Sequence, residues 1–160
     1  MSVNELLEDG NIIAKLANRP FEMDDIAYFV PKAERSYNAT WAKEIVSGKW
    51  ISRNWSTCKY NDNKISNGIG KRISEQGGLI FEIGTGPGGG YMPHILKSNP
   101  NATIIISDLS PTIACEWKHF LDNELDSPNI FYSAFDFCDI PFSDGCIDVV
   151  SDGGGIGNAE

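Results

Sequence analysis

The sequence has no long apolar run and few basic residues. It contains no stretch of about 18 or more apolar residues, so no helix is expected to cross a membrane. Its 13 Lys and Arg stand against 22 Asp and Glu, which gives a net charge of −9. Phosphate backbones and acidic membrane surfaces favour clustered Lys and Arg, so this balance argues against nucleic-acid and membrane partners.

Cysteine is also scarce. The four cysteines, at positions 58, 115, 138 and 146, form no CxxC pair, so no metal site is expected. Free thiols in a cytoplasmic protein are the simplest interpretation. The first ten residues are acidic and lack a signal-peptide core, which also favours the cytoplasm.

What the chain does contain is a cluster of glycines directly after an apolar stretch. Residues 79–83 are apolar except for Glu82 and predict a buried parallel strand; glycine follows at 84, 86, 88, 89 and 90. Glycine permits sharp turns and close approach of a ligand, and the N–H groups of a following helix would face the same ligand. We expect a nucleotide-type site here. A tight strand-to-helix turn without a ligand is the alternative.

Two ligand classes fit this loop. Gly84, Gly86 and Gly89 satisfy the dinucleotide pattern G-x-G-x-x-G, and Asp108 follows at about the expected distance. Glu82 argues against a pyrophosphate, because at roughly 6 Å and an effective dielectric near 20 each charge pair would cost about 3 kcal/mol. It favours a ligand that carries an amino group. A purely structural role for Glu82, in capping or ion pairing, stays open.

Strand and helix patterns alternate in the second half of the chain. Alternation of this kind predicts an α/β fold with a doubly wound, mostly parallel sheet. Ser110 and Pro111 supply an N-cap and a favourable first residue for one of the helices. The expected strands are 79–83, 103–107, 129–134 and 147–151, and the expected helices are 89–98 and 111–125.

The first half has helical patterning. We expect residues 1–76 to form an N-terminal helical segment, a cap or lid, and residues 77–160 to form the ligand-binding domain. Trp50, Trp55 and Tyr60 are expected either to cover the ligand or to pack a helical layer. His94 and His119 are expected to serve in packing or at the surface. The expected helices of this half are 4–17, 39–47 (stopped by Gly48) and 63–75.

Four motifs together resemble a known family. The pattern Glu82-x-Gly84-x-Gly86-x-Gly88 looks like the first motif of class I S-adenosylmethionine-dependent methyltransferases. Residues 103–110 resemble that family's second strand, 135–142 its third-strand exit, and 143–150 the approach to its fourth strand. The resemblance covers about residues 65–155 and is greatest to small-molecule methyltransferases of the ubiquinone-biosynthesis-like group.

The resemblance implies a Rossmann-like sheet of strand order 3-2-1-4 that stops before the family's last three strands. It implies S-adenosylmethionine as cofactor, S-adenosylhomocysteine as product and a small-molecule methyl acceptor; it identifies no catalytic base. The strand 4 edge would be exposed, which suggests a homo-oligomer or a truncated sequence. The residues implied in cofactor binding are Glu82, Gly84, Thr85, Gly86, Gly88, Asp108, Leu109, Asp136, Phe137 and Ser151.

Within that assignment, each acidic residue has an expected role. Glu82 would accept from the methionine ammonium, Asp108 from both ribose hydroxyls and Asp136 from the adenine amino group. Asp108 could instead be a turn or cap residue and Asp136 a loop carboxylate, and Leu109 could pack on the adenine face or belong to the core. Two further functions stay open: a cofactor-binding or oligomeric remnant without turnover, and an NAD(P)-dependent oxidoreductase.

Overall fold

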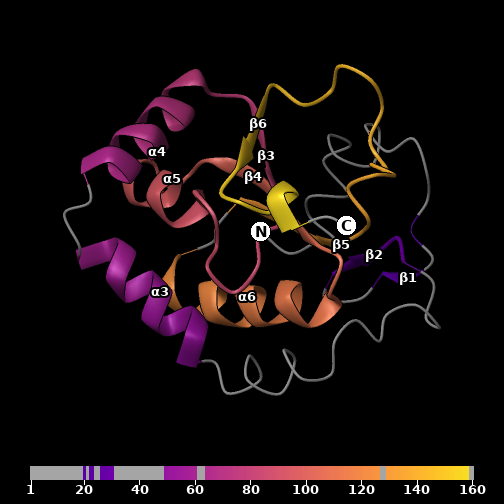
Figure 1. The fold of residues 1–160 in the computed structure, drawn as a ribbon, viewed down its shortest axis with the longest axis horizontal. Helices are drawn as coiled ribbons and strands as arrows, with labels where there is room; N and C mark the ends of the chain where they lie inside the picture. Colours follow the sequence, from indigo (N-terminus) through magenta and orange to yellow (C-terminus); the bar gives the residue numbers. More distant parts are fainter. Residues whose placement is uncertain are drawn as a thin grey trace.

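A mostly parallel six-stranded sheet forms the centre of the protein (Figure 1). The computed structural model describes residues 20, 22–23, 26–30, 49–60, 64–126 and 129–158. All strand pairs are parallel except the pair formed by the first two strands. The strands are β1 (Glu22–Met23), β2 (Ala27–Tyr28), β3 (Leu79–Ile83), β4 (Thr103–Asp108), β5 (Ile130–Ala134) and β6 (Val149–Asp152).

The strands lie in the order β1-β2-β5-β4-β3-β6. An open, mostly parallel α/β sheet was expected and is present. The expected order 3-2-1-4 describes only β5, β4, β3 and β6, and the complete order differs because β1 and β2 extend the sheet beyond β5. Strands of two residues carry too little periodic pattern to be recognised in a sequence. The strand β2 forms here because the edge of β5 offers backbone groups that need partners, as when Phe29 N–H donates to the Ala134 carbonyl at 2.8 Å, and β1 in turn pairs with β2.

The helices expected at 63–75, 89–98 and 111–125 are all present, with ends that differ by at most three residues. The expected helix 39–47 lies outside the described residues, as does the expected helix 4–17. A helix that was not expected begins at Lys49, directly after the glycine that had been interpreted as a stop. The helices are α3 (Lys49–Tyr60), α4 (Lys64–Gln76), α5 (Met92–Ser98), α6 (Pro111–Glu124) and a short 3-10 turn, η3 (Ile156–Asn158). Pro111 begins α6 as expected, but the Ser110 side chain makes no capping hydrogen bond.

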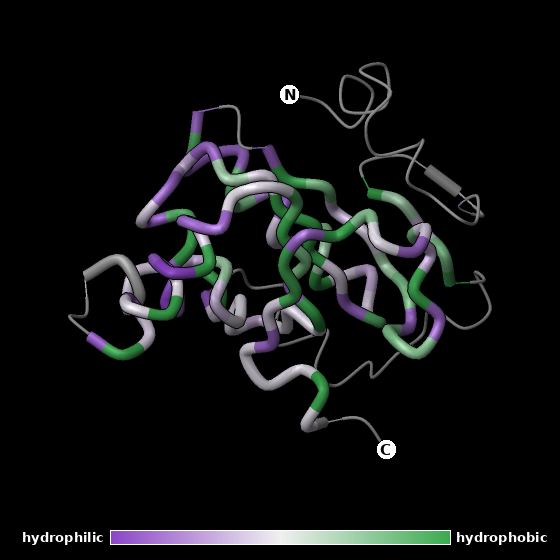
Figure 2. The backbone as a smooth tube through the Cα atoms, turned by 90° about the horizontal axis from the view of Figure 1, so that it is seen from above, coloured by the Kyte–Doolittle hydropathy of each residue, from purple (hydrophilic) through white to green (hydrophobic). Residues whose placement is uncertain are grey.

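All four described α-helices pack on one face of the sheet. Side chains from α3, α4, α5 and α6 share one apolar cluster with β3, β4 and β5. The other face is covered by residues 135–147, where Phe135 and Phe142 pack on Phe81 and Phe131. Figure 2 shows hydrophobic segments along the backbone through the centre of the molecule.

Chain direction explains the two faces. The path from β3 through α5, β4 and α6 to β5 moves steadily one way, so right-handed crossovers place its helices on the same face. The return from β5 to β6 passes the opposite face and is irregular over its described residues. The doubly wound arrangement, with helices on both faces, is therefore not seen in the described part of the chain.

The strand β6 is one edge of the sheet. Among the described strands it pairs only with β3. Val150 in this strand is 59% exposed, whereas Ile147 and Val149 pack partly against the two apolar clusters. Apolar exposure at this edge is therefore centred on Val150.

Candidate ligand site at the carboxyl edge of the sheet

The loop between β3 and α5, residues 84–91, requires glycine for internal reasons. The backbone enters the left-handed region at Gly84 (φ +54°) and Gly90 (φ +53°), where other residues are strained. Space is also short, because a Cβ at Gly84 would lie 2.8 Å from the Cα of Gly155 and one at Gly90 would overlap Oε1 of Glu82. Part of the glycine pattern is thus explained by packing alone.

Gly88 is different. It is exposed, and a Cβ placed on it would meet no atom within 4 Å. Its conformation does not require glycine either, since it is not among the residues with positive φ. Gly88 therefore marks the open side of the loop, where a ligand would find room.

Glu82, the fourth residue of β3, is fully buried. Its Oε2 accepts a hydrogen bond from the Ser151 hydroxyl, its Oε1 accepts from the Gly153 N–H at 3.0 Å, and the Tyr91 N–H also donates to the carboxylate. Burial, helped by the negative charge of Asp152, raises the pKa of Glu82 from 4.5 to about 7 against the lowering effect of these hydrogen bonds. The structure thus shows Glu82 bonded inside the protein, while contact with a ligand ammonium stays a prediction.

Asp108 ends β4, the neighbour of β3. Its Oδ2 accepts from the Gly86 N–H at 3.0 Å and its Oδ1 accepts from the Ser110 N–H at 2.9 Å. Burial raises the pKa of Asp108, and the two backbone hydrogen bonds lower it. Asp108 therefore has the turn role that was the alternative interpretation of the sequence, and it also connects the end of β4 to the glycine loop.

Two side chains that the sequence did not assign to the site hold the back of the loop. Trp117 Nε1 on α6 donates to the Gly86 carbonyl at 2.7 Å, and Asn54 Nδ2 on α3 donates to the Pro87 carbonyl at 3.0 Å. They lie 31 and 33 residues from their partners, so no local pattern could have revealed them. Because C=O and N–H point in opposite directions in a trans peptide, the bond to Asn54 turns the Gly88 N–H away from α3.

The site lies where the direction of strand addition reverses. From β3 the chain adds β4 on one side and later β6 on the other, so the carboxyl ends of β3 and β6 form a topological switch point. Open α/β sheets bind ligands at such points. Thr85 is buried at the end of β3, and its N–H donates to the Ser107 carbonyl at 2.8 Å. The expected residues Glu82, Gly84, Thr85, Gly86, Asp108 and Ser151 are thus brought together by direct contacts.

The remaining expected residues lie at the same edge but are less closely connected. Leu109 follows β4 and is 36% exposed. Asp136 follows β5, is exposed, and accepts from the Cys138 N–H at 2.9 Å in a local turn. Phe137 packs partly against the second apolar cluster. The adenine role of Asp136 and Phe137 stays a prediction.

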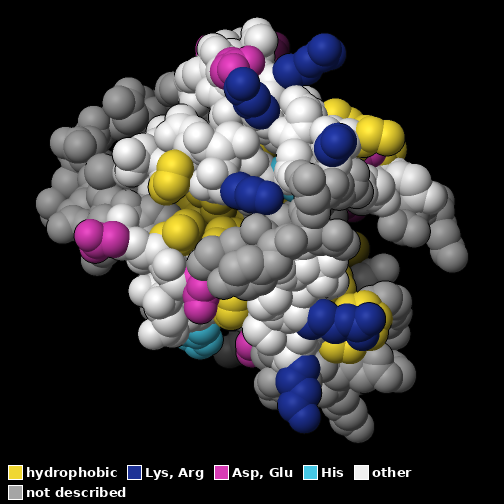
Figure 3. Space-filling view, turned by 90° about the vertical axis from the view of Figure 1, so that its left-hand side faces the viewer, with side chains coloured by type: hydrophobic (Ala, Val, Ile, Leu, Met, Phe, Trp, Pro, Cys, Tyr) yellow, Lys and Arg dark blue, Asp and Glu magenta, His cyan; other side chains and the backbone are white. Residues whose placement is uncertain are grey.

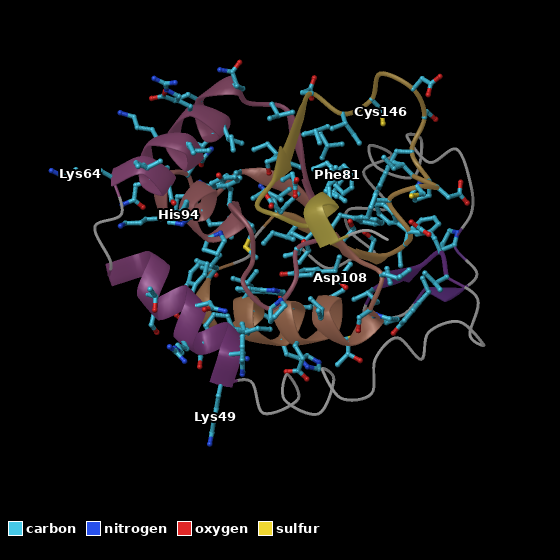
Figure 4. The ribbon with its side chains drawn as sticks, viewed as in Figure 1. Lys49, Lys64, Phe81, His94, Asp108 and Cys146 are labelled. Atoms are coloured by element: carbon cyan, nitrogen blue, oxygen red, sulfur yellow. The ribbon has the colours of Figure 1, made fainter. Side chains whose placement is uncertain are left out.

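His94 and Trp55 serve in packing. His94 is buried on α5 with its Nδ1 2.9 Å from Asn67 Oδ1 on α4, and burial lowers its pKa. Figure 4 shows it well separated from Asp108. Trp55 is buried and meets Phe120 edge-on, with ring centroids 5.9 Å apart. Packing of the helical layer, the second interpretation of Trp55, is confirmed.

The described residues hold no group of three or more His, Cys, Asp and Glu that could bind a metal ion. Of the helices in the described ranges, none is long and apolar enough to cross a membrane. The face on the α3 and α4 side of the molecule carries separate Lys and Arg side chains with apolar side chains between them (Figure 3).

Comparisons with known proteins assign neither a family nor a function to this chain. No protein-family model matches the sequence, and neither the curated proteins nor the solved structures contain a significant match.

Proposed function

We propose that this chain binds S-adenosylmethionine at the carboxyl edge of its sheet and transfers the methyl group to a small-molecule acceptor. The observation that carries the proposal is the placement of Asp108 beside the glycine loop at the switch point of the sheet. The motif resemblance supports the same ligand.

The geometry of Asp108 fits a ribose. An ionised carboxylate has about four lone-pair positions, and the Gly86 and Ser110 N–H groups occupy two. One position remains on each oxygen, which matches the two neighbouring hydroxyls of a ribose. The backbone bonds fix the carboxylate in advance, so little side-chain entropy is lost when the ligand binds.

The glycine loop and the neighbouring turns supply the rest of the proposed site. Gly88 leaves space for the close approach of a ligand. Leu109 would pack on the adenine face, and Asp136 would accept from its amino group, as the resemblance implies. Glu82 has no exposed surface, so the proposed site does not include it among the residues that touch the ligand.

S-adenosylmethionine, when bound, supplies a methyl group that is already activated for displacement. The chain then has to bind the cofactor and the acceptor, align them and exclude water. Holding the two reactants together lowers the barrier to methyl transfer through proximity. The described residues identify no general base. An acceptor that must lose a proton would need one, whereas other acceptors would not.

A dinucleotide is the second candidate ligand. Burial raises the pKa of Glu82 to about 7, so repulsion of a pyrophosphate is weaker than the sequence indicated. Gly84, Gly86 and Gly89 keep the required spacing, and Asp108 suits either ribose. The two ligands must therefore be separated by experiment.

The test is calorimetric titration with S-adenosylhomocysteine and, separately, with NAD. We expect saturable binding of S-adenosylhomocysteine alone, weakened about tenfold or more by Asp108→Asn through loss of charge-assisted hydrogen bonds. The matched control is Asp144→Asn, which changes an exposed carboxylate and should leave the affinity unchanged.

Each other outcome has a definite meaning. Binding of NAD alone would replace the proposal with an oxidoreductase. Binding of neither would refute a cofactor site in this chain. Binding of S-adenosylhomocysteine without methyl transfer from S-adenosylmethionine to any member of an acceptor panel would support a binding module without turnover.

A further inference from the structure

One buried carboxylate connects three separate segments of the chain. Glu82 is in β3, Tyr91 ends the glycine loop, and Ser151 and Gly153 belong to β6 and its exit. The bonded residues of β6 and its exit lie 69 and 71 positions beyond Glu82 in the sequence. The exits of β3 and β6, which border the proposed crevice, therefore meet at this side chain.

The space around this carboxylate is filled. A Cβ at Gly90 would overlap Oε1 of Glu82, and a Cβ at Gly153 would overlap the Cα of Gly90. The two loops thus touch backbone to backbone, with Glu82 packed against them and no exposed surface of its own. A ligand group could reach Glu82 only by separating these loops.

We propose that Glu82 is a positioning residue, which holds the exit of β6 against the exit of the glycine loop and shapes the crevice without touching the ligand. This inference rests on the proposed function. It gives Glu82 a different role from the one that the motif suggested, contact with the ligand's ammonium group.

The contacts of Glu82 do not depend on its charge. A protonated carboxyl group can donate from Oε2 to the Ser151 hydroxyl, which also accepts, while Oε1 still accepts from the Gly153 N–H. The pKa of about 7 agrees with this, since burial favours the neutral form. A ligand-binding carboxylate, in contrast, would need its charge.

Among the described residues, the charge that acts on Glu82 is that of Asp152, so no cation compensates a buried negative charge there. Asp152 on β6 is itself acidic and raises the pKa of Glu82. His94 on α5 has its pKa lowered by burial, which favours its neutral form. Asp108 on β4 bonds to Gly86 and Ser110.

The test compares Glu82→Gln with Glu82→Ala. A glutamine can donate to Ser151 and accept from Gly153, so it resembles the protonated carboxyl group. In titrations with S-adenosylhomocysteine at pH 6 and pH 8, we expect the dissociation constant of Glu82→Gln to stay within about threefold of that of the unmodified chain. Glu82→Ala should bind S-adenosylhomocysteine about tenfold more weakly or worse, because this substitution leaves buried hydrogen-bond donors without partners.

The opposite pattern would refute the inference. If the charge binds the ligand's ammonium group, Glu82→Gln loses as much affinity as Glu82→Ala. The affinity of the unmodified chain then rises as pH increases from 6 to 8, and that of Glu82→Gln does not. Ser151→Ala, which removes a single hydroxyl group, replaces Glu82→Ala if that variant does not fold.

A second measurement needs no ligand. Amide hydrogen exchange at Tyr91 and Gly153 should remain slow in Glu82→Gln and become about tenfold faster or more in Glu82→Ala. Unchanged exchange in Glu82→Ala, or equally fast exchange in both variants, would refute the positioning role. Failure of the proposed function would give a different result. The unmodified chain would then not bind S-adenosylhomocysteine, while the two variants would still differ in hydrogen exchange as expected.

Discussion

The buried carboxylate of Glu82 should make the stability of the protein depend on pH in a direction that one substitution can isolate. Its pKa rises from 4.5 to about 7 on folding. Below pH 4.5 the folded and unfolded chains both hold the proton. As pH rises toward 7 the unfolded chain releases it while the folded chain retains it, so the free energy of unfolding falls and then levels off above about pH 7.

The size of this loss follows from the two pKa values. The difference between about 7 and 4.5 is about 2.5, and each pKa unit corresponds to about 1.4 kcal/mol, so the loss is about 3 kcal/mol. No correction for solvent screening is needed, because the side chain has no exposed surface. A change of this size is a large fraction of the stability of an ordinary domain.

Glu82→Gln removes the titration and keeps the shape of the side chain. Urea unfolding from pH 4.5 to 8 should show the free energy of unfolding of the unmodified chain falling by about 3 kcal/mol relative to the variant. Asp108 and His94 also titrate with shifted pKa values, but they are present in both proteins and cancel in the difference. Glu75→Gln removes an exposed carboxylate on α4 and should keep the original profile.

Parallel profiles for the two proteins would contradict the raised pKa of Glu82. A difference that varies by less than about 1 kcal/mol over this range would mean that Glu82 titrates near its ordinary pKa in the folded chain. Its enclosure by the glycine loop and the exit of β6 would then be wrong.

Three further outcomes follow from the packing of the site. Gly90→Ala should lower the free energy of unfolding by about 2 kcal/mol or more in urea titrations, because the new methyl group overlaps a buried carboxylate oxygen at a positive φ; Gly88→Ala, in open space, should change it by less than about 0.5 kcal/mol. Equal effects would contradict the loop geometry. Trp117→Phe should lower the melting temperature, since loss of its hydrogen bond to Gly86 costs about 1 kcal/mol; an unchanged value would show that this bond contributes nothing. If the chain self-associates through β6, Val150→Lys should yield monomers in sedimentation, whereas an unaltered oligomer would place the interface elsewhere.

Much of the parallel sheet could be predicted because its signals are local. The apolar stretches at 79–83, 103–108 and 130–134 are buried on both faces, and such strands are recognised from a few consecutive residues. The helix after Ser110 began at Pro111 as expected, for the same reason. The glycine cluster also predicts its loop directly, since positive φ values and crowded Cβ positions exclude other residues at several of these positions.

The first half of the chain was harder to predict, apart from the helix α4, which lies close to its expected range of 63–75. The short strand β2 pairs with the edge of β5 and β1 pairs with β2, and these partners exist only in the assembled sheet. The helix α3 begins directly after Gly48, where the sequence had suggested the end of a helix. Its Trp55 is buried against α6, so the stability of α3 comes largely from packing that no sequence window contains.

By itself, the sequence determined that an apolar strand runs into a glycine loop and that two strands carry an acidic residue at or next to their last position, because these features depend on residues close together in the chain. Only the tertiary structure decided what those acidic residues contact. Glu82 is enclosed by residues about 70 positions away, while Asp108 is tied to Gly86 across 22 positions. Burial and hydrogen bonding depend on which segments the fold brings together, and they set the pKa and the accessibility of each carboxylate.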